Sequence, residues 1–297
     1  MTFSFGLGDR GGQLETGVPV LGGEPTELLA DRAEAAGREG LVRLWRGRGL
    51  LAGFAREDAG ADLEGATARM YADILRAARG ANIFRIWNFV PRINENGPGG
   101  LENYRSFCRG RSLAFEGALG PRFREFLPAA SAVGGPDGWM AVAFLACAGP
   151  VRHFENPAQV PAYLYPPEHG PRPPSFARAT VVERHGGLDA YISGTSAIVG
   201  HETVCARQTL AQLDRTIANL SLIARACGLG ESLGSGRACA RHFKVYLRHG
   251  EEMPVVAEAL AARLLAPGDR VSYLRADICR EELNVEVELA VRGAPRA

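Results

Sequence analysis

The sequence predicts an α/β protein built from two similar halves. An order of helix, strand, helix, strand, strand occurs twice along the 297 residues, and a proline-rich segment, 156–178, separates the two occurrences. Because a helix and a sheet each bury one apolar face, we expect each half to be a mixed sheet covered on one face by its two helices. We place an N-terminal unit at 1–150 and a C-terminal unit, which includes the proline-rich segment, at 151–297.

The first half is predicted from apolar periodicity and turn residues. Its elements are, in chain order, a hairpin over 41–45 and 50–54, a helix over 62–79, a strand over 83–90, a helix over 101–119 and a strand pair over 130–133 and 139–148. In the first helix Leu63, Met70 and Ile74 share one face, and Asp62 is suited to cap its N-terminus. The sequence Gly-Gly-Pro-Asp-Gly over 134–138 favours direct pairing of the last two strands.

The second half repeats this order. Its predicted elements are a strand over 188–199 with a glycine kink, a helix over 205–226, a strand over 243–248, a helix over 254–265 and two strands over 271–279 and 283–291 joined by a short turn. In the first of these helices, Leu210, Leu213, Ile217 and Leu220 recur at spacings of three and four, as on one face of an amphipathic helix. Gly228 is well placed to end that helix.

Composition argues against several classes of protein. The chain carries 34 basic and 33 acidic side chains, a formal net charge of +1, whereas a nucleic-acid or membrane surface needs a clustered basic excess. No apolar run approaches the ~20 residues of a membrane span, and the first residues lack the pattern of a signal peptide. We therefore expect a cytoplasmic protein that binds neither nucleic acid nor membrane.

The cysteines and the lysine limit the possible chemistry. The closest two cysteines, Cys227 and Cys239, are twelve residues apart, so the chain has no cysteine pair of zinc-site spacing. We expect reduced thiols in a cytoplasmic protein. Lys244 is the only lysine, and a Schiff-base enzyme would have to use it.

The proline-rich segment has an unusual composition. Seven of its 23 residues are proline, which excludes a helix or a central strand. It also carries two tyrosines, a histidine and two arginines, and an arginine fork matches a carboxylate with two parallel hydrogen bonds. Two interpretations stay open: a rigid wall around an anionic ligand, or a stiff connection between the two halves.

Two sets of motifs resemble known families. The second half resembles the RidA/YjgF family through Ile192-Ser-Gly-Thr195, Gln208, Asn219-Leu220 and Val285-Glu-Val-Glu288. A closer match covers most of the chain through Arg85-Ile-Trp-Asn-Phe-Val-Pro91, Leu101-Glu-Asn-Tyr-Arg-Ser-Phe-Cys-Arg-Gly-Arg111, the proline-rich segment, Ser193-Gly-Thr195, Gly200-His-Glu-Thr203 and Leu274-Arg-Ala-Asp-Ile-Cys-Arg280. This ordered set resembles the chorismatases, whose fold is similar to two fused RidA-like units. The resemblance implies two fused RidA/YjgF-like (chorismate-mutase-like) α+β units.

The resemblance also implies a substrate. Chorismate is a compact dianion with one carboxylate on its ring and one on its enolpyruvyl ether. The family pattern places Arg109 and Arg172 at the positions that bind these carboxylates. On spacing alone, Arg109 would be a surface side chain. Tyr104, a third expected contact, lies five residues before Arg109, so the two share a pocket only if the helix is irregular there.

Further substrate contacts are expected from the proline-rich segment and from the strand before the second-half helix. Tyr163 and Tyr165 alternate along an extended stretch and point opposite ways, and we prefer Tyr163. His169 stands where the family has a tyrosine and can donate a similar hydrogen bond. The resemblance adds Thr195 as a hydrogen-bond donor and Ser196 as a residue that sets the room near the substrate.

The expected catalytic residues are Glu286 and Cys279. Glu286 and Glu288 share one face of a strand; a solvated acidic face is the ordinary interpretation, but the apolar residues around them suggest a buried strand. The resemblance implies that Glu286 is the general acid, kept protonated by desolvation, and that it protonates the terminal methylene of the enol ether so that pyruvate leaves. The aromatising members of the family resemble this chain in having cysteine at position 279, where a thiol can relay a proton; an inert buried thiol is the alternative.

Three classes of function therefore remain. The first is a chorismatase of the 3-hydroxybenzoate synthase type, with its hydrolytic sibling, which gives a dihydroxycyclohexadiene carboxylate, as the alternative within the family. The second is a RidA-like enamine/imine hydrolase, and the third is a non-catalytic protein that binds small acids. The chemistry of the first class requires no metal and no organic cofactor. We expect a monomer with internal pseudo-symmetry whose partner is a small-molecule substrate.

Overall fold

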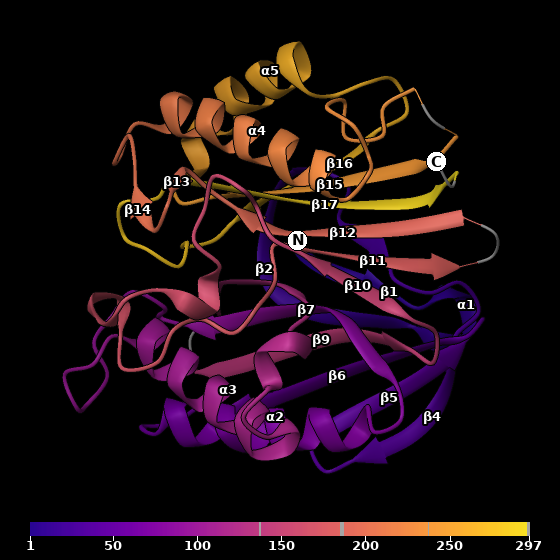
Figure 1. The fold of residues 1–297 in the computed structure, drawn as a ribbon, viewed down its shortest axis with the longest axis vertical. Helices are drawn as coiled ribbons and strands as arrows, with labels where there is room; N and C mark the ends of the chain where they lie inside the picture. Colours follow the sequence, from indigo (N-terminus) through magenta and orange to yellow (C-terminus); the bar gives the residue numbers. More distant parts are fainter. Residues whose placement is uncertain (137, 185–186, 237, 296–297) are drawn as a thin grey trace.

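The computed structural model describes residues 1–136, 138–184, 187–236 and 238–295. Two sheets lie face to face in the middle of the molecule, and one pair of helices covers the outer face of each sheet (Figure 1). The apolar core is correspondingly layered, with one cluster between the sheets and one between each sheet and its helices. The predicted α/β class, with two fused units that are each a mixed sheet covered on one face by helices (Figure 1), is confirmed.

The first unit forms the six-stranded sheet, in the order β4-β5-β6-β9-β7-β8. Its elements are β4 (Glu34–Glu39), β5 (Val42–Gly47), β6 (Leu50–Asp58), α2 (Leu63–Ala77), β7 (Asn82–Pro91), α3 (Asn103–Leu119), the short 3-10 helix η1 (Phe123–Phe126), β8 (Ala129–Gly135) and β9 (Trp139–Cys147). Asp62 caps α2 as predicted, because its side chain accepts a hydrogen bond from the backbone N–H of Gly65 at 2.8 Å.

The second unit repeats this strand order as β10-β11-β12-β17-β15-β16 within the nine-stranded sheet. Its elements are β10 (Val151–Phe154), η2 (Ala162–Leu164), η3 (Pro167–His169), β11 (Ala179–Arg184), β12 (Gly187–Thr195), β13 (Ile198–Val199), β14 (Glu202–Thr203), α4 (Thr209–Ala226), β15 (Ala240–Leu247), η4 (Gly250–Glu252), α5 (Met253–Arg263), β16 (Arg270–Arg275) and β17 (Val285–Ala294). The strand order alone therefore establishes the duplication.

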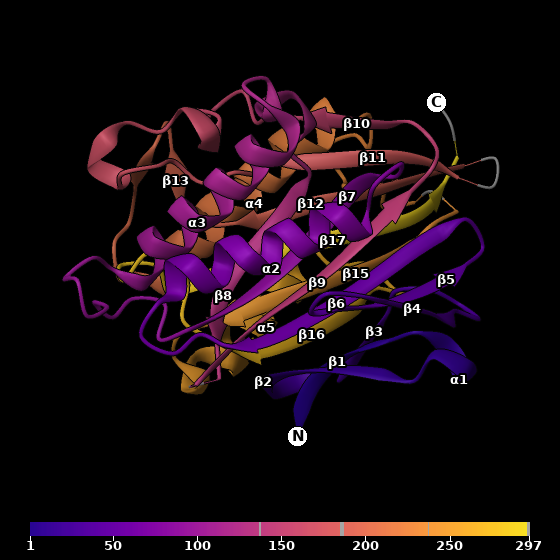
Figure 2. The same ribbon diagram turned by 90° about the horizontal axis from the view of Figure 1, so that it is seen from below.

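The N-terminal strands extend the sheet of the second unit. They are β1 (Thr2–Gly6), β2 (Gln13–Gly23) and β3 (Thr26–Leu28), with the short helix α1 (Gly8–Gly11) between β1 and β2. Strand β2 pairs with β16, and Figure 2 shows these strands along one side of the molecule. The predicted boundary at residue 150 assigned this segment to the N-terminal unit, whereas its backbone hydrogen bonds join it to the other sheet.

The hairpin predicted over 41–45 and 50–54 is confirmed as β5 and β6, but the pairing predicted for the last two strands was wrong in both units, and for the same reason. Strand β7 lies between β8 and β9, and β15 lies between β16 and β17. In each unit the strand after the second helix runs parallel to the strand before that helix, as a crossover connection requires. The last strand then enters the middle of the sheet, where both of its faces are covered. Hydrophobic periodicity identifies a buried strand but carries no information about its neighbours.

The helix predicted over 205–226 begins four residues later. Cys205 and Arg207 have φ values of 55° and 59°, in the left-handed region that an α-helix cannot include. The chain therefore turns at these residues before α4 starts at Thr209. The backbone N–H of Arg207 donates to the carbonyl of Glu282 at 2.9 Å, so this turn is held beside the loop over 276–284.

Candidate active site

A cavity of about 760 Å³ opens between the two units. Its walls come from the loop and helix over 94–111, from β8, from the proline-rich segment, from the chain over 194–206 and from the segment over 279–286. The volume falls in the ~300–1,000 Å³ range of small-molecule sites. Because segments of both halves supply its walls, the cavity exists only when the two units pack together.

Glu286 lies in the wall of this cavity, on β17, and its residue is 4% exposed. Ser196 Oγ donates a long hydrogen bond of 3.4 Å to its Oε2, and among the described residues Oε1 has no hydrogen-bond partner. Burial, with the charge of Glu288 as a second cause, raises the pKa of Glu286 to about 8. The side chain is therefore a protonated carboxylic acid at neutral pH.

Glu288, two residues along the same strand, has the opposite environment. Trp87 Nε1 donates to it at 2.7 Å, Arg85 Nη2 donates at 2.6 Å, and Lys244 Nζ lies 2.6 Å away. Burial alone would raise the pKa of Glu288, but the charges of Arg85 and Lys244 lower it to about 2. One face of β17 thus carries a neutral carboxyl next to an ionised one. Such a difference in pKa allows Glu286 to act as an acid while Glu288 keeps a constant negative charge.

Gly194 makes the room for the acid. A Cβ atom at this position would lie 2.0 Å from Oε1 of Glu286, far inside van der Waals contact, although the φ value of Gly194 is not one that requires glycine. The backbone N–H of Gly194 donates to Ser131 Oγ at 2.9 Å, and Ser131 in turn hydrogen-bonds to Glu288. Strand β12 therefore leaves space for the carboxyl group of Glu286 and is linked through Ser131 to the carboxyl group of Glu288.

Two buried arginines line the same cavity with unused donors. Arg111 is 1% exposed and Arg178 is 5% exposed. Among the described residues, Nε and Nη2 of Arg111 and Nε of Arg178 have no hydrogen-bond acceptor. Arg178 Nη2 donates to the hydroxyl of Tyr165 at 2.7 Å. Because a buried charged donor without an acceptor is costly, these guanidinium groups are suited to bind an anion that enters the cavity.

Aromatic and thiol groups complete the wall. Tyr104, Tyr165 and Cys279 all line the cavity. Burial raises the pKa of the Cys279 thiol to about 12, and the nearby Glu286 contributes to that shift. Cys279 is therefore a neutral thiol, which can pass on a proton but is not poised as a thiolate nucleophile.

Five of the nine predicted site residues line the cavity. They are Tyr104, His169, Ser196, Cys279 and Glu286. They come from α3, from the proline-rich segment, from the chain after β12 and from β17 with its preceding loop, so the fold brings together residues up to 182 positions apart in sequence (104 and 286).

The structure does not place the two predicted carboxylate-binding arginines in the cavity. Arg109 has a side chain that is 48% exposed and forms an ion pair with Glu64 at 3.3 Å. Arg172 donates to Glu116 at 2.5 Å. Neither belongs to the cavity wall, because each lies on the side of its segment that faces helix α2 or α3.

Two further predicted contacts lie outside the cavity wall. Tyr163 packs against the apolar cluster beneath α2 and α3, whereas Tyr165 lines the cavity. Thr195 donates its hydroxyl to the carbonyl of Ser193 at 2.8 Å and is absent from the wall. The two tyrosines therefore face different surroundings, but Tyr163 lies in the 3-10 helix η2 and not in the extended stretch that was predicted. The one that faces the cavity is Tyr165 and not the preferred Tyr163.

The sequence held a signal for Arg111 that the family pattern did not supply. Tyr104, Cys108 and Arg111 are spaced four and three apart, so they share one face of α3. The cavity wall includes Tyr104 and Arg111, and the charge of Arg111 acts on the Cys108 thiol between them. Arg178 carried no comparable signal, since its place directly before β11 has no periodicity.

Taken together, the fold and the cavity define a class of protein: two fused α/β units of the same strand order that hold a protonated acid and two buried arginines in a shared cavity. Comparisons with known proteins agree. A family profile described as "Chorismatase FkbO/Hyg5-like, N-terminal" matches residues 28–146. A chorismatase of Streptomyces hygroscopicus is 36% identical over 267 residues, which cover 87% of this chain and 76% of the relative. The chain therefore belongs to the chorismatase family.

Two other relatives add detail. A 3-hydroxybenzoate synthase of Streptomyces hygroscopicus is 40% identical over 216 residues, which cover 70% of this chain; the match spans 63% of that relative's length. A crystal structure of a chorismatase superposes with a TM-score of 0.79 at 34% identity, covering 88% of this chain and 80% of that one. In the described part of the chain, no helix combines the length and the apolar character needed to span a membrane.

Proposed function

We propose that this protein converts chorismate to 3-hydroxybenzoate and pyruvate. The observation that carries the proposal is the protonated carboxyl of Glu286 in a cavity that also holds the unpaired donors of Arg111 and Arg178. A dianion needs two cationic partners, and cleavage of an enol ether needs an acid; this cavity offers both. The 40% identity to a protein named 3-hydroxybenzoate synthase supports the choice of product.

In the proposed mechanism, Arg111 and Arg178 bind the two carboxylates and thereby orient the enolpyruvyl group toward Glu286. The acid protonates the terminal methylene carbon, which creates an oxocarbenium ion at the ether carbon. Pyruvate then leaves by one of two routes. In the first, water adds to the cation and the resulting hemiketal breaks between its carbon and the ether oxygen, which stays on the ring. In the second, the neighbouring ring hydroxyl displaces the ether oxygen from the ring carbon, so that pyruvate leaves with that oxygen and an epoxide forms. The ionised Glu288 nearby favours the positive charge that develops and helps to keep Glu286 protonated.

The product is decided by the step after protonation. If water attacks the cation, the product is the dihydroxycyclohexadiene carboxylate. If the neighbouring ring hydroxyl displaces the ether oxygen, the original C–O bond of that hydroxyl then breaks, and loss of a ring proton gives the aromatic 3-hydroxybenzoate. Cys279 supports the aromatic route because its neutral thiol lies in the same wall as Glu286 and can relay that proton. The proposed residues belong to the chain itself, and no step requires a cofactor.

The test is incubation of the purified protein with chorismate, with pyruvate measured in a coupled assay and the ring product identified by chromatography. Wild type should release pyruvate and an aromatic acid in equal amounts. Glu286→Gln should lower kcat by ~10²–10⁴-fold, the usual contribution of a general acid. Glu281→Gln, which changes a carboxylate at the solvent-exposed rim of the same cavity, should retain wild-type kcat.

Full activity of Glu286→Gln would remove the proposed acid. A RidA-like hydrolase is the second candidate, and the RidA-like fold of each unit favours it; release of ammonia from enamines or imines without pyruvate release from chorismate would select it.

A further inference from the structure

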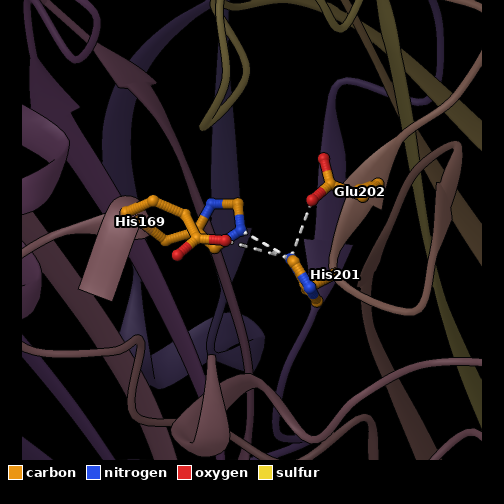
Figure 3. Close-up of side chains that lie close together, drawn as sticks. His169, His201 and Glu202 are labelled. Carbon is orange, nitrogen blue, oxygen red and sulfur yellow. Dashed lines mark hydrogen bonds and ion pairs between the residues drawn. The ribbon is translucent and has the colours of Figure 1, made fainter. Parts of the chain in front are cut away.

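Four side chains with metal-binding atoms meet at the rim of the cavity. None of the four takes part in the proposed reaction. They are Glu168, His169, His201 and Glu202, and one ligand atom from each lies within 4.8 Å of all the others. Figure 3 shows His169 and His201 directed at one another with Glu202 beside them. His169 belongs to η3 in the proline-rich segment, whereas His201 lies in the turn between β13 and β14 and Glu202 is the first residue of β14.

The spacing of these atoms fits a tetrahedral ion. Ligand atoms at ~2.0–2.2 Å from Zn²⁺ lie roughly 3.3–3.6 Å apart in a regular tetrahedron. His169 Nε2 lies 3.0 Å from His201 Nδ1. The same nitrogen of His201 lies 3.1 Å from Glu202 Oε1 and 4.0 Å from Glu168 Oε1. The measured distances bracket the tetrahedral edge, so small rotations of the side chains would complete the coordination.

We propose that Glu168, His169, His201 and Glu202 bind one divalent transition-metal ion, for which Zn²⁺ is the best fit. Two imidazole nitrogens select a transition metal over Mg²⁺ or Ca²⁺, which prefer oxygen ligands alone. Two carboxylates supply the remaining ligands and balance the charge of the ion. The side chains of Glu168 and Glu202 are 61% and 68% exposed, so the ion reaches the site directly from solvent.

The two segments that carry the ligands are already held together by the backbone. The N–H of Val160 donates to the carbonyl of Gly200 at 2.9 Å, and the N–H of Gly200 donates to the carbonyl of Ala158 at 2.9 Å. The ring of His169 also packs against Tyr165, with centroids 5.1 Å apart. Because the ligands are prepositioned, metal binding carries little of the entropy cost of ordering two free loops.

An ion at this site would change the charge at the cavity rim but would take no part in the proposed reaction. Glu168, His169 and Glu202 belong to the cavity wall, so the two carboxylates place negative charge where an anionic substrate enters. A bound divalent cation would cancel that charge and fix the proline-rich segment to the turn after β13. If the proposed function holds, Zn²⁺ should therefore lower the KM for chorismate and leave kcat nearly unchanged.

The direct test measures metal binding without substrate. The full-length protein, treated with EDTA and dialysed, is titrated with Zn²⁺ by calorimetry, and Co²⁺ is added in parallel because its visible absorption reports tetrahedral coordination. Wild type should bind one ion. His169→Ala and His201→Ala should each weaken binding by at least the ~10–100-fold that loss of even an outer-shell partner costs. Circular dichroism checks that each variant is folded.

Two matched variants serve as controls. His249→Ala removes an exposed histidine outside the cluster, and Cys205→Ser removes an exposed thiol that could itself attract Zn²⁺; both should bind like wild type. Absence of Zn²⁺ binding by wild type, or binding that survives both histidine variants, would overturn the proposal. Since no chorismate is present, failure here is distinguishable from failure of the proposed reaction, and the KM is measured with and without Zn²⁺ only once binding is found.

Discussion

Strands β9 and β17 occupy the same position in the two sheets but present different side chains to the interface between the sheets. Each is the last strand of its unit, and each lies between the strands that precede and follow the unit's first helix. Toward the interface between the sheets, β9 presents Ala141, Ala143 and Leu145, whereas β17 presents Glu286 and Glu288, which are 4% and 2% exposed.

The difference shows how a duplicated fold acquires one active site. Small apolar residues on β9 let the sheets approach. Three polar partners of Glu288 come from the first unit, namely Arg85 and Trp87 on β7 and Ser131 on β8, and two come from β15 of the second unit, namely Lys244 and Tyr246. The first unit thus supplies Arg85, one of the two cations that keep Glu288 ionised, while the second unit carries both acids and the other cation, Lys244. The active site belongs to the pair of units, not to either one.

The largest effect should come from removing the fixed charge on β17. Glu288→Gln leaves Arg85 buried without its carboxylate and leaves Lys244 with Glu27 as its remaining partner; breaking a buried ion pair typically costs ~3–5 kcal/mol. Because the neighbouring charges hold the pKa of Glu288 at about 2, its contribution to stability is present above the unfolded value near 4.5 and is lost as pH falls toward 2. Urea unfolding should show a large difference between variant and wild type at pH 7 that narrows in acid.

The same variant should also shift the pH dependence of catalysis. In the proposed mechanism the acid form of Glu286 is the active form, so wild-type kcat/KM should fall as pH rises through about 8, the pKa of that buried group. Removal of the Glu288 charge lowers the pKa of Glu286 and moves this limb to lower pH. If kcat/KM of a folded Glu288→Gln variant still fell at the same pH as in wild type, the result would contradict the electrostatic coupling of the two carboxyl groups.

The next largest effect should come from a substitution at Gly194, in strand β12. Gly194→Ala places a methyl group against the carboxyl of Glu286 and forces the acid out of position. We expect kcat to fall by roughly 10²-fold, the scale of a misplaced catalytic group. Gly99→Ala, where the added methyl group meets no atom within 4 Å, is the control and should leave kcat unchanged.

The arginines allow a comparison between sequence and structure. Arg111→Met and Arg178→Met each remove a cationic partner of the substrate, and a hydrogen bond to a charged group is worth ~1.5–3 kcal/mol, or about 10–100-fold in KM. Arg109→Met and Arg172→Met remove the arginines that pair with Glu64 and Glu116 and should leave KM unchanged. If steady-state kinetics instead showed a raised KM for Arg109→Met and Arg172→Met and an unchanged KM for Arg111→Met and Arg178→Met, the carboxylate-binding arginines would be the two predicted from the sequence.

The smallest effect on rate should come from Cys279→Ala. The thiol is proposed to relay a proton after pyruvate has begun to leave, so total pyruvate release should change by less than about tenfold while the product shifts toward the non-aromatic diol. Chromatography of the ring products measures the ratio directly. An unchanged ratio would leave Cys279 as a buried thiol without a part in the reaction.

The sequence by itself determined the repeated order of elements and the two carboxyl groups on one face of a strand, since periodicity and caps are local properties. It also contained the spacing of Tyr104 and Arg111 on one face of α3, although the family pattern pointed to Arg109 instead. It did not determine the strand order, because a buried strand has the same pattern beside any neighbour.

Only the tertiary structure decided which arginines face the cavity and which acid is protonated. Arg109 and Arg111 lie two residues apart on one helix, yet one pairs with Glu64 at the surface and the other is buried with free donors. Likewise, both Glu286 and Glu288 are desolvated, but their pKa values differ because Arg85 of the first unit and Lys244 of the second contact Glu288 directly. Burial and charge at these positions are set by segments distant in the chain, so they arise only when the two units pack together.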